Sequence, residues 1–196
     1  IRRTPGIKPH IGRMEYLGFD LEGETLGILG YGNIGAAVAR RARAFGMKVY
    51  YYKRHRLSAV EEEDEGISYL PMDELLARCR VLSVHTPYSA ETHHLIDARA
   101  LAKMRRDAVL INTSRGAVVD EAALLEALTA GRIAGAGLDV FEQQDCASAG
   151  LSALLQVAMT PHTGTATTST RRAMALEQLA AVRAFLSGSA DLPRVL

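Results

Sequence analysis

Residues 27–35 decide the fold of this chain, and they read Gly27-Ile28-Leu29-Gly30-Tyr31-Gly32-Asn33-Ile34-Gly35. The apolar residues 26–29 predict a buried strand, and the alanine-rich stretch that starts at Ala36 predicts a helix. Between them, Gly30 permits a tight strand-to-helix turn, Gly32 lets the backbone approach a phosphate, and Gly35 lets the helix pack against the strand. Three glycines alone are a weak signal. Because a strand and a helix flank them, they predict a site for the pyrophosphate of a dinucleotide at a helix N-terminus.

The composition is that of a globular chain with balanced charge. Its 196 residues are 48% hydrophobic, and 23 basic residues face 22 acidic ones, so charge favours neither a nucleic-acid nor a membrane-surface partner. No apolar run approaches the roughly 18 residues that span a bilayer, and we expect a cytoplasmic protein. Cys79 and Cys146 match no metal-ligand spacing, which predicts free thiols and no metal site. Since the chain begins at Ile1 rather than Met, we expect a piece of a longer protein.

Apolar, β-prone runs alternate with helical patterns along most of the chain, which predicts an α/β fold with a doubly wound parallel sheet of the Rossmann type. The predicted strands are residues 26–29, 48–52, 67–70, 81–84, 108–111, a segment within 133–140, and 157–160. The predicted helices, besides the one from Ala36, are residues 72–78, 97–104, 120–129 and 171–186. The acidic run 61–65 is expected to form a solvated surface turn.

Ligands of such sheets bind outside the carboxyl ends of the strands, where this sequence places polar segments. Arg115 follows one strand and provides a cation that could hold a carboxylate and polarise a carbonyl group. His162 follows another and provides an imidazole that can donate or accept a proton near neutral pH. His85, at a third strand end, is expected to shape its loop. The remaining histidines lie away from these loops and are expected to be structural or exposed, namely His10, His55, His93 and His94.

Four segments in order resemble the signatures of the D-isomer-specific 2-hydroxyacid dehydrogenase family, and within it the glyoxylate and hydroxypyruvate reductases. They are residues 27–35, 111–116, 135–142 and 160–164. The resemblance implies that Arg115 binds the substrate carboxylate and carbonyl, that His162 is the general acid and base, and that Asp139 orients the nicotinamide carboxamide. It also implies a loop beside the nicotinamide ring at Thr86 and Pro87. Further cofactor contacts are expected at Gly30, Gly32, Asn33, Ile34, Gly35, Thr113, His162 and Gly164.

Two positions depart from the pattern of this family. Gln144 stands where the family has its catalytic glutamate, and a neutral amide orients an imidazole without stabilising its charged form. We therefore expect His162 to be less basic and a weaker proton donor. Lys53 and Arg54, joined by Arg56, stand where an acidic residue would mark NAD. Basic side chains attract a 2′-phosphate, which predicts NADP in preference to NAD.

The resemblance also implies a division of the chain. Residues 1–24 are expected to be a linking segment, residues 25–164 the dinucleotide-binding domain, and residues 165–196 a helix and tail that return towards a substrate domain absent from this chain. Without that domain we expect cofactor binding with poor turnover, and a homodimer formed through the nucleotide domain. Two alternatives remain open. One is a dinucleotide-sensing regulatory protein of the corepressor kind, and the other is a cofactor-binding fragment without activity.

Overall fold

The structure is a computed structural model, and it describes residues 18–143 and 149–188. It contains a sheet of seven strands: β1 (Thr25–Leu29), β2 (Lys48–Tyr52), β3 (Ser68–Tyr69), β4 (Val81–Val84), β5 (Val109–Asn112), β6 (Gly135–Leu138) and β7 (Val157–Met159). The helices are α1 (Asn33–Ala44), α2 (Ala59–Glu65), α3 (Met72–Arg78), α4 (Ala98–Lys103), α5 (Glu121–Thr129), α6 (Ala149–Ala153) and α7 (Thr168–Leu186), with a 3-10 turn at Gly116–Val118.

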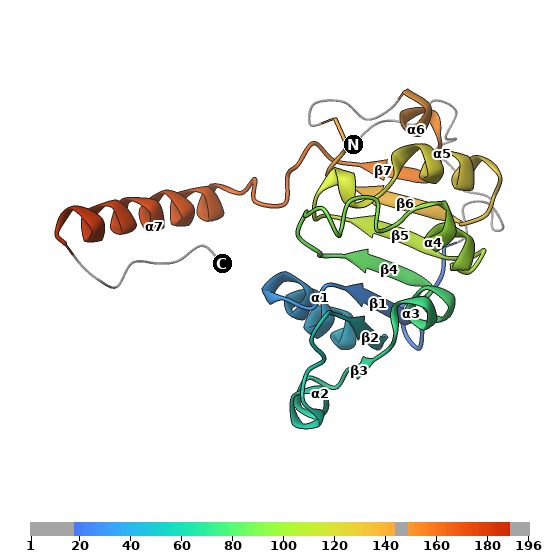
Figure 1. The fold of residues 1–196 in the computed structure, drawn as a ribbon, viewed down its shortest axis with the longest axis horizontal. Helices are drawn as coiled ribbons and strands as arrows, with labels where there is room; N and C mark the ends of the chain where they lie inside the picture. The colour runs from blue at the N-terminus through green and yellow to red at the C-terminus, as the bar shows by residue number, and fades with distance from the viewer. Residues whose placement is uncertain (1–17, 144–148, 189–196) are drawn as a thin grey trace, which may run out of the picture.

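The strands lie in the order β3-β2-β1-β4-β5-β6-β7, and every adjacent pair is parallel (Figure 1). The chain therefore builds the sheet outward from β1 in one direction and then crosses to β4 and continues in the other. This confirms the predicted doubly wound α/β fold. The reversal of direction between β1 and β4 is the point where dinucleotides bind in such sheets.

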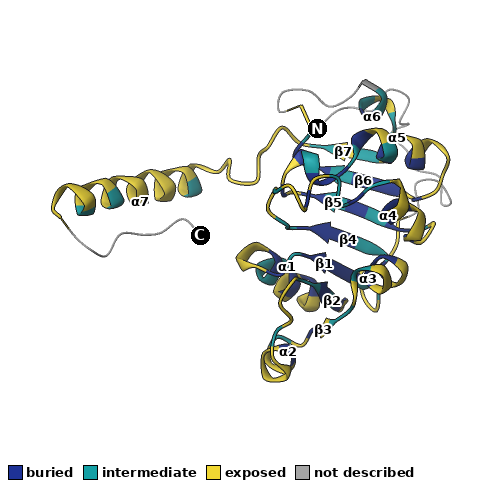
Figure 2. Cartoon of the chain, viewed as in Figure 1, coloured by how far each residue is buried: buried dark blue, intermediate teal, exposed yellow. Residues whose placement is uncertain are grey.

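Each face of the sheet has its own hydrophobic core, because successive side chains of a strand point to opposite faces. On one face, Ile28 and Tyr51 pack with Ala39 and Ala42 of α1. On the other, residues such as Leu82 and Leu110 pack under α3, α4 and α5. Figure 2 shows the central strands in the colour of buried residues. The sheet is thus a rigid base for the loops at its edges.

Local sequence signals place most helix ends correctly. Asp97 and Asp120 cap α4 and α5, each accepting a hydrogen bond from the backbone N–H three residues on. Several boundaries differ from expectation: α1 begins at Asn33 and α7 at Thr168, both earlier than predicted, while α4 and α5 each begin one residue after the capping aspartate and α4 ends at Lys103. Two short elements, α6 and the turn at Gly116–Val118, were not predicted.

The acidic run 61–65 forms most of helix α2, so the predicted surface turn is wrong. Ser58 and Glu61 form a capping box at its start, and Gly66 ends it with a left-handed backbone (φ 58°). Glu62 faces the sheet and is buried with 9% exposure. Charge runs usually lie in solvent, but here the helix directs one of its acids inward, against the hydroxyl of Tyr51.

Helix α7 projects away from the sheet (Figure 1). None of its residues is buried, and several large apolar side chains along it are exposed: Met174, Leu176, Leu179, Val182, Phe185 and Leu186. A helix with this much exposed apolar surface is typical of one that packs against another unit. No helix in residues 18–143 and 149–188 combines the length and the apolar character needed to cross a membrane.

Candidate cofactor and catalytic site

All predicted site loops lie along one edge of the sheet, because parallel strands end at the same edge. The loops that follow β1, β2, β4, β5, β6 and β7 carry, in that order, the glycine motif, Lys53 and Arg54, Thr86 and Pro87, Thr113 and Arg115, Asp139, and His162. Hydrogen bonds and close contacts join each loop to its neighbours. Arg115 and His162 therefore belong to the same edge, separated by the single strand β6.

The glycine loop has the geometry that a pyrophosphate needs. Gly30 has a φ of +95°, and a Cβ there would stand 2.8 Å from the backbone of His85, so only glycine fits. A Cβ on Gly35 would stand 2.5 Å from the carbonyl oxygen of Gly30, so α1 packs directly on the turn. Beside Gly32, by contrast, no atom lies within 4 Å of the Cβ position, which leaves an open cradle.

The N-terminus of α1 faces this cradle without a cap of its own. Gly32 has no side chain to accept the first N–H groups, and the first turn contains no acidic residue. Asn33 and Ile34 begin the helix with exposed side chains. Because the first turn of a helix has N–H groups without intrahelical partners, this end is free to bind an anion. The residues present therefore fit a dinucleotide.

The loop after β4 is tied to the glycine loop. The backbone N–H of His85 donates to the carbonyl of Leu29 at 2.7 Å, and the hydroxyl of Thr86 donates to the same oxygen at 3.1 Å. Pro87 is exposed beside them. Burial lowers the pKa of His85, whose Nε2 lies 2.9 Å from the Ser83 hydroxyl. A partly buried imidazole bound to Ser83 is consistent with the expectation that His85 shapes this loop.

Arg115 is held by the turn that follows β5. The buried side chain of Asn112 accepts hydrogen bonds from the N–H and hydroxyl of Ser114 at 3.0 and 2.8 Å, and donates one to the carbonyl of Arg115 at 3.0 Å. Gly116 allows the turn to touch the next loop, because a Cβ there would stand 1.9 Å from the Phe141 carbonyl. The Arg115 side chain is exposed at this edge. Asn112 therefore positions the turn that carries Arg115. From the sequence it was only one polar residue in the segment that follows a strand.

The carboxylate of Asp139 holds the loop that carries His162 by hydrogen bonds. Its carboxylate accepts hydrogen bonds from the N–H of Thr163 at 2.8 Å, from the N–H of Gly164 at 3.1 Å and from the hydroxyl of Thr160. Burial raises the pKa of Asp139, but these hydrogen bonds outweigh burial, and the pKa lies below its usual range. His162 itself is exposed, adopts a φ of 53°, and donates its N–H to the Asp139 carbonyl at 3.0 Å.

The loop after β6 is anchored at Glu142. Its backbone N–H donates to the buried carboxylate of Glu121 at 2.6 Å, and its side chain contacts Nε2 of His94. His94 also lies 3.8 Å from Asp120 and has a φ of 50°. The expectation that His94 lies away from the site loops is therefore wrong: the chain brings it back beside α5. Gln144, two residues beyond this anchor, lies outside the described residues.

The basic side chains after β2 divide into two kinds. Lys53 is partly buried and Arg54 exposed, and within the described residues neither forms an ion pair. Arg56 instead donates from Nε and Nη2 to Glu62 at 2.8 and 2.9 Å. Only the first two are free for a phosphate.

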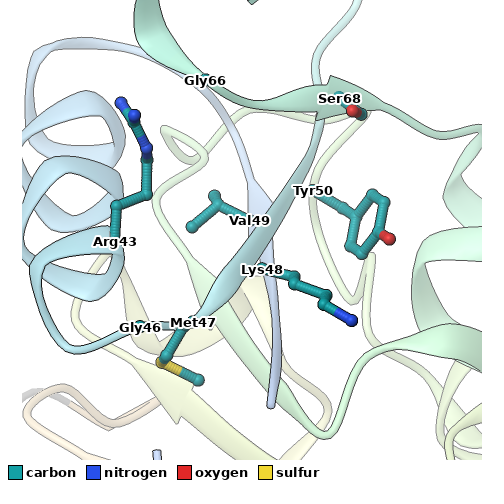
Figure 3. A pocket seen from close by; sticks show the side chains of 8 residues that line it. All are labelled: Arg43, Gly46, Met47, Lys48, Val49, Tyr50, Gly66 and Ser68. Carbon is teal, nitrogen blue, oxygen red and sulfur yellow. The ribbon is translucent and has the colours of Figure 1, made fainter. Parts of the chain in front are cut away.

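A second concavity, of about 420 Å³, lies at the other end of β2 and does not belong to this site. Lys48 and Val49, at the start of β2, line it together with Arg43 and Gly66 (Figure 3). Because Lys48 and Val49 begin the strand, whereas Lys53 and Arg54 follow its carboxyl end, the concavity lies towards the opposite edge of the sheet from the glycine loop.

The chain matches a family model described as D-isomer specific 2-hydroxyacid dehydrogenase, NAD binding domain, over residues 7–164. The chain belongs to this family. The four segments that suggested the resemblance all lie within the matched residues. Cys79, one of the two cysteines, is a buried free thiol within the same domain, and Cys146 lies outside the described residues.

Glyoxylate reductases of other organisms are similar over most of this chain. A glyoxylate reductase of Thermococcus litoralis is 49% identical over 160 residues, which cover 82% of this chain and 48% of the relative. Glyoxylate reductase 1 of Saccharomyces cerevisiae is 44% identical over 158 residues, 80% of this chain and 45% of the relative. The chain thus spans about half the length of the curated relatives it matches.

Solved structures of other proteins have a similar fold over most of this chain. The crystal structure of a glyoxylate reductase from Paecilomyes thermophila has a TM-score of 0.82 at 45% identity, covering 86% of this chain and 51% of that one. A D-lactate dehydrogenase from Aquifex aeolicus, solved with NAD and lactic acid, has a TM-score of 0.84 at 35% identity, covering 91% and 58%.

Proposed function

We propose that this family member is part of a reductase that uses NADPH to reduce a small 2-keto acid of the glyoxylate or hydroxypyruvate class. The observation that carries the proposal is the common edge, where the open glycine cradle, Arg115 and His162 are joined through the strand ends. The names of the similar glyoxylate reductases support the substrate class.

Each side chain has a role that its chemistry suits. A reduced nicotinamide supplies a hydride to the carbonyl carbon when it is bound. Arg115 holds the carboxylate of the keto acid and opposes the negative charge that grows on the carbonyl oxygen. His162 donates a proton to that oxygen and accepts one in the reverse direction. Asp139, with Thr163 and Gly164 bound to its carboxylate, keeps the His162 loop in place.

Gln144 distinguishes this site from the family pattern, in which a glutamate stands at this position. As an amide it orients His162 without the negative charge that a glutamate provides, so we propose a less basic imidazole and slower proton donation near neutral pH. The same substitution is the one feature that favours the alternative, a dinucleotide-sensing regulatory protein in which turnover is lost and cofactor binding is kept.

The preference for NADP rests on Lys53 and Arg54. Both follow β2, where the adenosine ribose lies in a doubly wound sheet, and no acidic side chain follows the strand directly. A 2′-phosphate pairs well with an unpaired lysine and arginine, while an acid would repel it.

We propose that a further part of the protein completes the site. Residues 25–164 form the dinucleotide domain, and residues 1–24 and 165–196 connect it to a substrate domain. The exposed apolar side chains of α7 and the half length of the match support this division. A homodimer in the cytoplasm is proposed for the whole protein.

Two measurements test the proposal. The first is titration of this chain with NADPH and NADH, with tighter binding of NADPH expected. The second is a panel of 2-keto acids assayed with the whole protein, where glyoxylate or hydroxypyruvate is expected to be reduced fastest. Cofactor binding without turnover of any keto acid would support the regulatory alternative, and the absence of binding by either dinucleotide would refute both.

A further inference from the structure

Three side chains from β2, helix α2 and the loop between them form a small network that the cofactor motifs do not include. The hydroxyl of Tyr51, a fully buried residue, donates to Oε1 of Glu62 at 2.7 Å. Arg56 donates to both oxygens of the same carboxylate, from Nε at 2.8 Å and from Nη2 at 2.9 Å. The N–H of Leu57 donates to the Tyr51 hydroxyl at 2.9 Å.

This network fixes the direction of Arg56. A bidentate guanidinium–carboxylate pair uses the two N–H donors that point the same way, and it is stronger than a single contact. The Glu62 side chain is only 11% exposed, whereas that of Arg56 is 59% exposed. A buried carboxylate needs its charged partner, since losing that partner leaves its charge uncompensated. The pKa of Glu62 is accordingly lowered to about 2, chiefly by the hydrogen bonds from Arg56.

Arg54, unlike Arg56, is not paired with an acid in the part of the chain that the structure describes. Arg54 is exposed, lies two residues before Arg56, and forms no ion pair within residues 18–143 and 149–188. The loop between β2 and α2 thus carries three basic side chains, of which one is neutralised from the helix side.

We propose that Glu62 is a specificity-determining residue that withholds Arg56 from the 2′-phosphate of NADP, so that Lys53 and Arg54 alone bind it. The inference rests on the proposed preference for NADP. If so, Glu62 of α2 limits how strongly the chain prefers NADP to NAD, although this buried acid does not contact the cofactor.

Two contacts hold Arg56: its ion pair with Glu62, and a weaker cation–π contact in which the guanidinium carbon lies 5.2 Å from the centroid of the Tyr69 ring. In Glu62→Gln the amide oxygen can still accept the hydrogen bond from the Tyr51 hydroxyl. The side chain no longer carries the negative charge that attracts the guanidinium ion. Arg56 then becomes a third free cation beside the phosphate, and an additional exposed ion pair tightens binding by about two- to fivefold. NADH lacks the 2′-phosphate, so its affinity is expected to stay the same.

The experiment measures dissociation constants for NADPH and NADH with this chain, by the change in nicotinamide fluorescence. The variants are Glu62→Gln, Arg56→Gln and the double variant. Glu63→Gln is the matched control, because it removes the same charge from the adjacent, exposed position of α2. Circular dichroism checks that each variant is folded.

Three results are expected. Arg56→Gln alone changes the affinity for NADPH by less than about twofold, since the side chain is already bound to Glu62. Glu62→Gln tightens NADPH binding by about two- to fivefold and leaves NADH unchanged. The double variant loses this gain, while Glu63→Gln does not produce it.

Other results overturn the inference. If Arg56→Gln alone weakens NADPH binding strongly, Arg56 is itself a phosphate ligand. The double variant decides the same question without leaving the Glu62 carboxylate uncompensated: if it also binds NADPH much more weakly than the unmodified chain, Arg56 is a phosphate ligand. A gain in Glu62→Gln that Glu63→Gln reproduces, or no gain at all, also overturns it. An unmodified chain that binds NADH as tightly as NADPH refutes the proposed cofactor preference instead, a distinguishable outcome.

Discussion

Replacing Asp139 by asparagine tests whether one buried carboxylate holds the loop that carries His162. The carboxylate accepts two backbone N–H groups, of Thr163 and Gly164, and the hydroxyl of Thr160. In asparagine one oxygen becomes an NH₂ group, which faces a donor, so one buried hydrogen bond is lost and the others lose their charge. With a lost hydrogen bond to a charged group costing about 1.5–3 kcal/mol, we expect Asp139→Asn to lower the free energy of unfolding by about 2–4 kcal/mol at pH 7.

The pH dependence of this loss has a definite sign. Because the pKa of Asp139 is lower in the folded state than in the unfolded chain, its stabilisation is present above the unfolded pKa of about 3.9 and disappears as the pH falls through the folded value. Urea unfolding of this chain at pH 7 and at successively lower pH values measures it. The difference between the original chain and Asp139→Asn should be constant above about pH 5 and should shrink below about pH 4.

Asp97→Asn is the matched control. Asp97 also has a lowered pKa, chiefly because its carboxylate accepts the N–H of Ala100, but asparagine is an equally good helix cap. This variant should change the free energy of unfolding by less than about 0.5 kcal/mol. If Asp139→Asn is as stable as the control at pH 7, or if its loss is the same at all pH values, the carboxylate does not hold the loop as argued.

Three further substitutions test, in turn, the packing of the core, the close contact at Gly116 and the role of Gln144. Leu75→Ala, at a fully buried position of α3, should cost about 2–5 kcal/mol in urea unfolding, whereas Leu179→Ala, 48% exposed on α7, should cost less than about 0.5 kcal/mol. Gly116→Ala places a methyl group 1.9 Å from the Phe141 carbonyl and should destabilise the chain by at least about 1–3 kcal/mol, a loss that an undisturbed melting temperature would contradict. Gln144→Glu should move the basic limb of the pH–rate profile for keto-acid reduction by the whole protein to higher pH, and an unchanged profile would show that residue 144 does not act on His162.

Local patterns predicted most of the framework. The glycine motif, the period of the apolar runs and the capping aspartates depend on residues within a few positions of one another, and for this reason α3, β2 and β4 have the predicted bounds. The positions of Arg115 and His162 at one edge also followed, because parallel strands place their carboxyl ends together.

Contacts between distant segments decided the rest. The sequence predicted that an acidic run lies in solvent, but the turn of helix α2 directs Glu62 onto Tyr51, which no local pattern reveals. His94 meets Glu142, 48 residues further along the chain, and Asp139 grips a loop more than twenty residues away. Alternation and glycine spacing determined the fold class, and with it the edge at which the predicted site residues lie, by local sterics and burial. Only the tertiary structure determined which polar side chains pair inside it, because an acid or a histidine finds its partner through chain crossings that bring separate elements together.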